Sequence, residues 1–337
     1  MSDWTYSKAG VDLSSISKLH EIALKKVLKV NELLKVKYGG IGGFATWVDV
    51  GGIKLVLHCD GVGTKSIIAR ILGRYWVIGW DSVIVNVNDV VCGGAKPVAL
   101  VSYVAMEKPD EQAYRGIING VEKAALENGI AMMGGETAVL PDLVNGIDVS
   151  CTLLAVRKVE KEVSVGKNDI VLGLPSSGLH ANGYSLVRKV VESTVGYDAF
   201  VEGVNIGEEL VKPVINYGPL IMEAFSNDLI TAAAHISGGA FKKVKRILDS
   251  RHNIVINAPK PPKVFEVLMN LGRISISEMY RVFNMGVGMV VALPDQNVGE
   301  FKRVALKYGL NAIDLGYVTE GEGKVIVNSY YGDVIEF

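Results

Sequence analysis

Short apolar runs that end in glycine-rich loops recur along this chain, and they constrain its fold more than any other feature of the sequence. The clearest run covers residues 53–58 and leads into the loop 60–65, with the sequence DGVGTK, and then into the helix-like segment 66–70. Glycine lets backbone N–H groups approach an anion closely, and a helix N-terminus favours negative charge. The order strand, glycine loop, helix therefore predicts an α/β fold with polar groups in its loops.

Two charged residues give this loop a chemical interpretation. Lys65 supplies a positive charge for phosphate oxygens. Asp60 would repel a phosphate, but its carboxylate fits if a cation such as Mg²⁺ lies between the two. The GxxxxGK[ST] spacing of a Walker A loop is missing. A plain glycine turn, with Asp60 as a cap and Lys65 in solvent, explains the hexapeptide equally well, so both interpretations stay open at this point.

The composition is that of a globular protein with a large core. The chain has 337 residues, more than one core usually organises, so we expect two domains. Its net charge is −1 without a long run of one sign, which argues against nucleic-acid and membrane-surface binding. Three cysteines, far apart, indicate a reducing compartment and neither a zinc site nor a disulfide framework. With no signal core and no membrane-length apolar run, we expect a cytoplasmic protein.

The first residues predict a helix, a glycine loop and a hairpin. Apolar residues recur at helical spacing from Ile16 to Val30, and the helix should end near Tyr38. Four glycines follow within 39–43, which predicts a mobile lid or a close approach to a ligand, with a flexible linker as the alternative. The pair at 51–52 separates two strand-like runs and indicates a hairpin.

Residues 76–92 leave their element type open, because the Val and Ile content favours a strand and the length favours a helix. As a helix, the segment would place Asp81, Asn88 and Asp89 on one face. Without other motifs, we interpret these side chains as a solvent-facing stripe.

The next motif repeats the logic of the first loop. A strand at 97–106 and a helix capped by Asp110 precede it. A short apolar run, 130–133, then leads into GGET at 134–137, again glycines followed by a carboxylate and a hydroxyl. With the acidic face of 76–92, the two loops could supply a Mg²⁺ set. Another strand is expected over 148–159.

The second half repeats the plan of strands, glycine loops and helices. A boundary is expected between residues 158 and 167, where charge rises. The predicted strands are 169–174, 289–293 and 312–318, and the predicted helices are 184–193, 213–226, 296–309 and one that starts after Gly238-Gly239. His180 and His235 lie in Gly/Ser loops at predicted strand–helix junctions, where α/β enzymes place functional groups.

The loops taken together resemble one known family. They are DGVGTK at 60–65, ND at 88–89 followed by GGAKP at 93–97, GGET at 134–137, SSGLHANGYSLVR at 176–188, HISGGAF at 235–241 and MYRVFNMGVGM at 279–289, with YSKAGVD at 6–12 and GGIGGF at 39–44. The set resembles the phosphoribosylformylglycinamidine cyclo-ligases, which are the aminoimidazole ribonucleotide synthetases of purine biosynthesis. Single motifs are shared across a superfamily, but this combination spans nearly the whole chain.

The resemblance implies a fold and an activity. The fold has two α/β domains with mixed sheets: residues 1–165 would bind ATP and Mg²⁺ and contribute to a β-barrel at a homodimer interface, and residues 166–337 would carry phosphate- and substrate-binding loops. The activity is ATP-dependent ring closure of formylglycinamidine ribonucleotide to aminoimidazole ribonucleotide, with release of ADP and phosphate.

The resemblance and the loop chemistry together assign site residues. Mg²⁺ is assigned to Asp60, Asp89 and Glu136, and catalysis to His180, His235 and Lys65. Contacts to nucleotide and substrate are expected from Lys8, Gly39, Gly40, Gly42, Gly43, Asp60, Gly61, Gly63, Thr64, Lys65, Asn88, Thr137, Ser177, Gly178 and Asn182. His58 and Cys59 depart from the family, which often has small or hydroxyl residues there, and we interpret Cys59 as buried in its strand.

Other members of the superfamily are the alternatives. Selenophosphate synthetase carries a reactive Cys or selenocysteine near its N-terminus, whereas this chain has no cysteine before Cys59. The hydrogenase-maturation carbamoyl dehydratase ends in a functional cysteine, and formylglycinamidine ribonucleotide synthetase is far longer. Thiamine monophosphate kinase remains the alternative enzyme, disfavoured by 235–241 and 279–289. A nucleotide-binding regulator without chemistry is disfavoured because the acidic residues and both histidines occur together.

Overall fold

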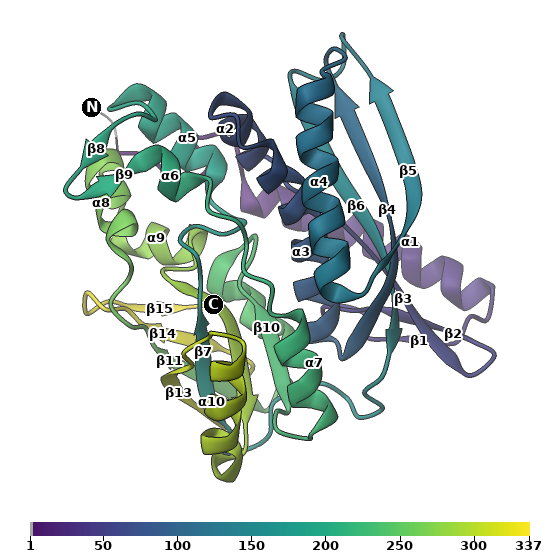
Figure 1. The fold of residues 1–337 in the computed structure, drawn as a ribbon. Helices are drawn as coiled ribbons and strands as arrows, with labels where there is room; N and C mark the ends of the chain where they lie inside the picture. Colours follow the sequence, from purple (N-terminus) through teal and green to yellow (C-terminus); the bar gives the residue numbers. More distant parts are fainter. Residues whose placement is uncertain (1–2) are drawn as a thin grey trace.

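Two β-sheets lie side by side, and each carries helices (Figure 1). The computed structural model describes residues 3–337, apart from the side chains of residues 13 and 14. Strands from residues 38–157 build the first sheet, and strands from residues 170–336 build the second. The α/β class with mixed sheets, predicted from the sequence, is confirmed.

The first sheet has six strands in the order β1-β2-β3-β6-β4-β5, and only β4 and β5 are parallel neighbours. The strands are β1 (Tyr38–Gly39), β2 (Trp47–Val50), β3 (Ile53–Gly61), β4 (Ala95–Met106), β5 (Ala131–Val139) and β6 (Ile147–Arg157). The predicted hairpin is confirmed, since Val50 pairs with Ile53 across Gly51 and Gly52. Both glycines have positive φ, 61° and 89°, as a two-residue turn between twisted strands requires.

Helices cover one face of the first sheet only. The helices of this half are α1 (Leu13–Leu33), α2 (Lys65–Ile71), α3 (Tyr75–Cys92) and α4 (Glu111–Asn128). Residues 76–92, whose element type the sequence left open, thus belong to a helix, α3. This helix packs on β3, β4 and β6, on α4, and on the second half. A Cβ at Gly79 would lie 1.8 Å from the carbonyl oxygen of Ile117, so this glycine lets α3 and α4 pack closely.

The second sheet has seven strands in the order β10-β12-β7-β13-β11-β14-β15. Its strands are β7 (Ile170–Pro175), β10 (Ala232–His235), β11 (His252–Asn257), β12 (Val287–Leu293), β13 (Ile313–Glu320), β14 (Val325–Asn328) and β15 (Val334–Glu336), and a separate hairpin pairs β8 (Phe200–Val201) with β9 (Val204–Asn205). The helices of this half are α5 (Tyr184–Ser193), α6 (Ile206–Leu210), α7 (Gly218–Ser226), α8 (Lys263–Gly272), α9 (Ile276–Val282), α10 (Val298–Lys307) and the 3₁₀ helices η1 (Ala240–Ile247) and η2 (Asp295–Asn297). Strand β12 is buried at every position, so the core of this half lies around it.

Several element boundaries differ from the sequence prediction. The first helix ends at Leu33, and Tyr38 already belongs to β1. The glycines of GGET lie inside β5, and a Cβ at Gly135 would meet the Ser102 carbonyl oxygen at 1.9 Å, so Gly135 allows β4 and β5 to pack closely. Residues 212–217 are not helical, and buried polar groups of α3 bind their backbone.

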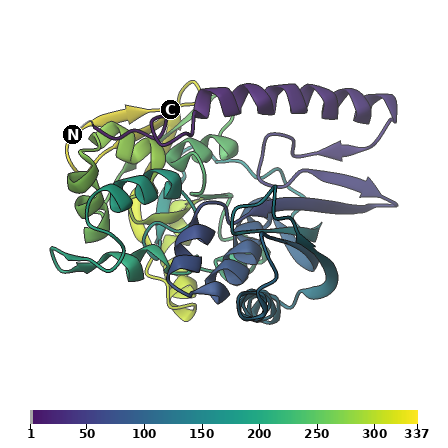
Figure 2. The same cartoon turned by 90° about the horizontal axis from the view of Figure 1, so that it is seen from above.

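The N-terminal arm lies on the second half. The Trp4 N–H donates to the Gly272 carbonyl, and the Tyr6 N–H donates to Glu278 Oε1. Helix α1 then runs from the second half along the side of the first sheet (Figure 2). Most of α1 is exposed, including Leu19, Ile22 and several other apolar side chains. No helix of residues 3–337 is long and apolar enough to cross a membrane.

Candidate active site

Lys65, expected to hold phosphate, is enclosed between the two halves of the molecule. Its Nζ lies 2.6 Å from Asp81 Oδ2 and donates to the carbonyls of His180 and Lys212. Burial lowers the pKa of Lys65, and the Asp81 carboxylate opposes this shift. The ammonium group has three donors and three protein acceptors, so Lys65 fastens α2 to the second half and offers no donor to a ligand.

The polar face of α3 is buried, so its interpretation as a solvent-facing stripe was wrong. Asp81 Oδ1 accepts the N–H of Val214 at 2.8 Å. The Asn88 side chain accepts the Tyr217 N–H at 2.9 Å and donates to the Ile215 carbonyl at 2.8 Å. These side chains hold the non-helical segment 212–217 against α3. Asn88, expected to contact nucleotide, has both polar atoms occupied by this segment.

The loop after β7 is also used for contacts within the protein. Oγ1 of Thr64 lies 2.8 Å from Oγ of Ser185, and the Ser177 hydroxyl donates to the Pro213 carbonyl. The Gly178 carbonyl accepts from Ser176 and Asn284, and Asn182 donates to the Val282 carbonyl. Ligand contacts from Thr64, Ser177, Gly178 and Asn182 therefore stay predictions.

His180 lies in the same buried contact. Its Nε2 accepts the N–H of Ile215 at 3.0 Å, and its ring centroid is 5.8 Å from that of Tyr217. Burial, and then the charges of His235 and Lys65, hold the pKa of His180 well below its ordinary value. A neutral imidazole whose lone pair is already engaged is a poor proton acceptor, so the geometry favours a packing role for His180 over the catalytic role.

His235, at the end of β10, is paired with Asp89 of α3. Its Nδ1 lies 2.7 Å from Asp89 Oδ1, and its Nε2 is buried without a hydrogen-bond partner among the described residues. A carboxylate on Nδ1 fixes the tautomer in which Nε2 carries the lone pair. The Asp89 carboxylate thus holds the imidazole of His235 in the orientation of a base. A buried nitrogen without a hydrogen-bond partner costs free energy, which a histidine with a purely structural role would avoid.

His58 is a residue that the sequence prediction missed. It extends from β3 toward α3, with Nδ1 2.7 Å from Asn86 Oδ1 and Nε2 3.5 Å from Asp89 Oδ2. Burial alone would lower the pKa of His58, but Asp89, with smaller contributions from Asn86 and Asp60, reverses this effect and the net shift is upward. Burial alone would raise the pKa of Asp89, but His235 and His58 hold it well below its ordinary range. Asp89 is therefore an ionised carboxylate between two histidines.

Asp60 belongs to the same cluster. Loss of hydration and the negative charge of Asp89 raise the pKa of the Asp60 carboxyl, while the Gly61 N–H, His58 and Lys243 act in the opposite direction. Asn86 donates to the Asp60 carbonyl and thereby fixes the end of β3. Two carboxylates that repel each other favour a cation between them, as the Mg²⁺ prediction requires. Among the described residues, no three His, Cys, Asp or Glu side chains are arranged as a complete metal site.

Glu136 is not brought to Asp60 and Asp89 within one chain. The Thr137 hydroxyl donates to Tyr114 of α4, so Thr137 faces the helices and Glu136 faces the open side of the sheet. Asp60 shares the helix side with His58, and β6 and β4 separate its strand from β5. Three strand spacings of about 4.8 Å, about 14 Å in all, exceed the reach of two side chains to one ion. Cys59 is exposed, which corrects its assignment as a buried residue.

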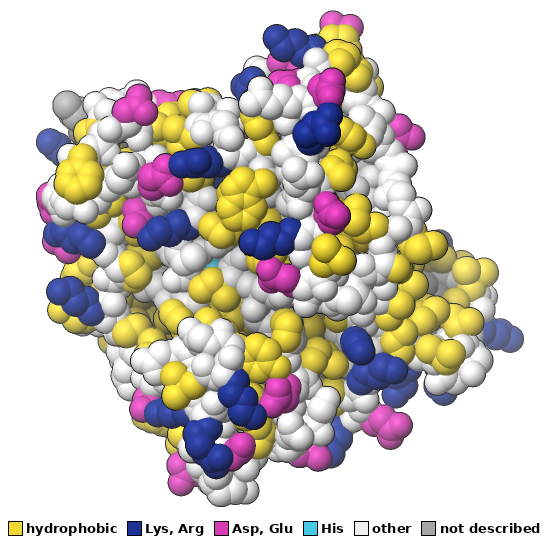
Figure 3. Space-filling view, viewed as in Figure 1, with side chains coloured by type: hydrophobic (Ala, Val, Ile, Leu, Met, Phe, Trp, Pro, Cys, Tyr) yellow, Lys and Arg dark blue, Asp and Glu magenta, His cyan; other side chains and the backbone are white. Residues whose placement is uncertain are grey.

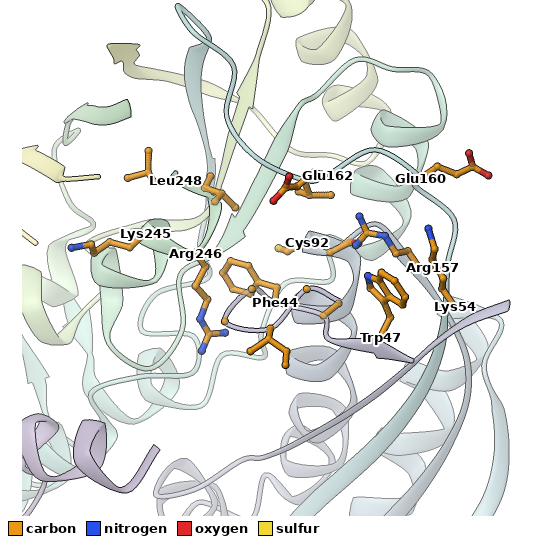
Figure 4. Close-up of a pocket in the computed structure, with 18 residues that line it drawn as sticks. Phe44, Trp47, Lys54, Cys92, Arg157, Glu160, Glu162, Lys245, Arg246 and Leu248 are labelled. Atoms are coloured by element: carbon orange, nitrogen blue, oxygen red, sulfur yellow. The ribbon is translucent and has the colours of Figure 1, made fainter. Parts of the chain in front are cut away.

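The glycine loop lines a pocket of about 570 Å³ (Figure 4). We call this the glycine-loop pocket, and its lining includes Gly40, Gly42, Gly43, Phe44, Trp47, Lys54, Cys92, Arg157, Glu162, Lys245 and Arg246. Arg246 lies over the Phe44 ring, 5.0 Å from its centroid, and thereby links η1 to the loop. Arg157 donates to the carbonyls of Gly93, Val159 and Lys161, which ties the segment between the two sheets to the end of α3.

The remaining predicted residues have separate places. A Cβ at Gly39 would lie 2.5 Å from the Trp47 ring, so this glycine serves packing. Lys8 is exposed, and its ammonium donates to the Asp3 carbonyl. Gly63 has φ of 64° in the turn before α2, and Gly61 ends β3.

The chain matches known proteins along nearly its whole length. The N-terminal domain of AIR synthase related proteins matches residues 43–156, and the C-terminal domain of these proteins matches residues 166–328. A phosphoribosylformylglycinamidine cyclo-ligase of Saccharolobus solfataricus is 38% identical over 98% of this chain and 98% of its own length. The chain belongs to the phosphoribosylformylglycinamidine cyclo-ligase family. The family named from the loop motifs is thereby confirmed.

Solved structures of other proteins share the fold of this cyclo-ligase family member. AaThiL, complexed with AMPPCP and TMP, aligns with a TM-score of 0.63 at 16% identity and covers 92% of this chain and 95% of its own. T. maritima PurL, complexed with FGAR, aligns with a TM-score of 0.59 at 15% identity over 90% of this chain and 48% of its own. At such identities the likeness concerns the two-sheet fold alone.

Proposed function

We propose that this protein closes the imidazole ring of formylglycinamidine ribonucleotide at the expense of ATP, which yields aminoimidazole ribonucleotide, ADP and phosphate. The observation that carries the proposal is the full-length match to a cyclo-ligase at 38% identity. The buried Asp89–His235 pair, close to the glycine-loop pocket, supports the proposal because it could act as the oriented base that the reaction needs.

The reaction needs an activated oxygen and a proton acceptor. ATP phosphorylates the formyl amide oxygen and so converts a poor leaving group into phosphate. The amidine nitrogen then attacks the formyl carbon, the carbon–oxygen bond breaks, phosphate leaves, and the nitrogen loses a proton. Phosphoryl transfer requires alignment and charge neutralisation more than covalent chemistry by the protein. The proton acceptor we assign is Nε2 of His235, whose lone pair is directed by Asp89 on the opposite nitrogen.

The glycine-loop pocket is the place we assign to ATP. Its volume of about 570 Å³ lies in the usual range for ligand sites. Gly42 has a positive φ of 85°, and a Cβ there would meet open space, so its backbone is accessible to a phosphate, whereas a Cβ at Gly40 would lie 2.6 Å from the Ala45 carbonyl oxygen. Lys54, Lys245 and Arg246 on its walls balance phosphate charge. Cys92, one turn after Asp89, forms part of the lining and thus places the pocket next to the pair.

Mg²⁺ would be held by Asp60 and Asp89 together with phosphate oxygens. This ion normally keeps one or two carboxylates and takes its other ligands from phosphates and water, so two carboxylates suffice. Its bound charge would neutralise the transferred phosphoryl group. Asp60 is the more accessible ligand, because Asp89 is buried between His235 and His58.

Replacing Asp60 with Asn should abolish ribonucleotide-dependent ATP turnover and leave the melting temperature nearly unchanged, because the amide keeps the shape and loses the charge. ADP formation by Asp60→Asn and by Asp148→Asn, an exposed carboxylate on β6, would be compared. The control should turn over normally. Near-normal turnover by Asp60→Asn would remove the metal assignment.

The open face of the first sheet is the surface we assign to a second copy of the chain. Strand β5 is exposed almost throughout, and Leu57 and Met133 are 70% and 69% exposed. Hydrophobic side chains gather at the right-hand edge of the molecule, over the β2–β3 hairpin and the far end of α1 (Figure 3). An extended apolar face on a sheet is typical of an interface. We also infer a cytoplasmic location, with which three unpaired cysteines agree.

Introducing a charge on β5, the exposed edge strand of this face, should separate the two copies. Met133→Asp should convert a dimer into a monomer in sedimentation, since the carboxylate would be buried without a partner. Leu126→Asp is the matched control, because Leu126 is 75% exposed on α4, away from the open face. If the unaltered chain sediments as a monomer, or Met133→Asp stays dimeric, the assignment fails.

A further inference from the structure

A second pocket lies between α1 and η1, and its walls are basic. We call it the α1–η1 pocket; its volume is about 470 Å³. The arm and α1 contribute Tyr6, Ile16 and His20. Opposite them, η1 contributes Lys242, Lys243, Lys245 and Arg246. Among the described residues that line it, none is Asp or Glu.

These four cations lie on one short helix and form no ion pair with a carboxylate of the described chain, although Asp60 and Asp89 lie near enough to Lys243 to act on its charge. Within residues 3–337, none of them is within ion-pair distance of a carboxylate, whereas other lysines of this half, such as Lys263 and Lys302, are paired. Four like charges on consecutive turns repel one another, which costs free energy unless an anion lies among them. Burial lowers the pKa of Lys243; the charge of Asp89 opposes this shift and that of Arg246 adds to it.

Backbone N–H groups in the pocket also favour an anionic ligand. Gly238 and Gly239 line the pocket, and Gly239, with φ of 94°, begins η1. Their N–H groups donate no hydrogen bond to another group of the described chain. A Cβ at either glycine would meet open space, so the backbone there is accessible to a ligand. Exposed N–H groups at the start of a helix are a favourable place for phosphate oxygens.

The α1–η1 pocket adjoins both the cluster of Asp60, Asp89 and His235 and the glycine-loop pocket. Lys243 is near enough to Asp60 and Asp89 to shift the pKa of Asp60 downward. Lys245 and Arg246 also line the glycine-loop pocket, so η1 forms a wall common to the two. A ligand anchored here by an anionic end would extend toward Asp89 and His235, while a nucleotide occupied the other side of η1.

We propose that the α1–η1 pocket binds the phosphate monoester of the ribonucleotide substrate, with Lys242, Lys243 and the Gly238–Gly239 backbone as its main donors. The apolar wall from Tyr6, Val11 and Ile16 fits the ribose side of such a ligand. The assignment of a ribonucleotide rests on the proposed function. The presence of a phosphate monoester site rests on the pocket itself.

The test is calorimetric titration of the full chain with ribose 5-phosphate and with ribose, without nucleotide. Ribose 5-phosphate should bind one site per chain and ribose should not. Each of Lys242→Met and Lys243→Met should weaken binding about tenfold, as expected for the loss of one charge-assisted contact. Lys189→Met, an exposed lysine on α5, is the matched control and should bind as the unaltered chain does. Melting temperatures report on folding of each variant.

Three results would overturn the proposal. They are no binding of ribose 5-phosphate, unchanged binding by the Lys242→Met Lys243→Met double variant, and competitive displacement by Mg-AMPPCP, which would place the phosphate in the glycine-loop pocket. Because the titration needs no turnover, a chain that binds ribose 5-phosphate but forms no imidazole product would contradict the proposed function and leave the phosphate site standing.

Discussion

Replacing Lys65 with Met should lower the free energy of unfolding by about 3–5 kcal/mol, the cost of leaving one charge of a buried pair without its partner. Lys65 is 1% exposed, and its ammonium group bonds Asp81 and two carbonyls of the second half. Met keeps the apolar stem and removes only the charge. Urea unfolding followed by circular dichroism measures the change.

Two further variants separate charge loss from general damage. Adding Asp81→Asn to Lys65→Met should recover part of the loss, because no unpaired charge then remains while the amide oxygen can still accept the Val214 N–H. Arg74→Met breaks the exposed pair with Glu208 and should cost less than about 1 kcal/mol. A loss below about 1 kcal/mol in Lys65→Met would show that Lys65 is not the fastening point described here.

Replacing His235 with Asn should lower kcat by about 10²–10⁴-fold, the usual contribution of a positioned acid or base. Asn retains a hydrogen bond to Asp89 but has no lone pair at the place of Nε2. The KM for ATP should change little, since His235 does not line the glycine-loop pocket. Steady-state kinetics with ADP detection measure both constants.

His180 provides the comparison for this variant. His180→Asn should lower the melting temperature, because the imidazole accepts the Ile215 N–H in the contact between the halves. Its kcat should fall much less than that of His235→Asn. If His180→Asn lost turnover at an unchanged melting temperature while His235→Asn remained active, His180 would be the catalytic base and His235 the packing residue.

The sequence predicted those structural elements that short contiguous motifs determine. The hairpin at Gly51 and Gly52 and the Asp110 cap of α4 follow from turn and cap chemistry, and both are found. The motif order identified the family for the same reason, since each motif is a short contiguous run. Such signals need no knowledge of what lies across the fold.

The roles of polar residues could not be predicted, because partners distant in sequence decide them. Asp81 and Asn88 bind a segment 133 and 129 residues away, and Lys65 binds carbonyls 115 and 147 residues away. Glu136 faces the open side of the sheet, whereas Asp60 shares the helix side with His58, and β6 and β4 lie between their two strands. In each case a motif residue serves packing or lies on another face of the sheet.

The basic face of η1 was missed for a different reason. Lysines in a run such as 242–246 normally lie in solvent, and only the position of α1 turns them into the wall of a pocket. His58 was noted as a departure from the family, but its contact with Asp89 depends on the packing of α3 against β3.

The measurement that tests the central claim most directly is a coupled assay with formylglycinamidine ribonucleotide, ATP and Mg²⁺, in which aminoimidazole ribonucleotide and ADP are followed together. We predict that the two products appear in equal amounts and that neither forms without the ribonucleotide. A folded chain that binds Mg-ATP but forms no imidazole product would contradict the account, and thiamine monophosphate would then be the substrate to test.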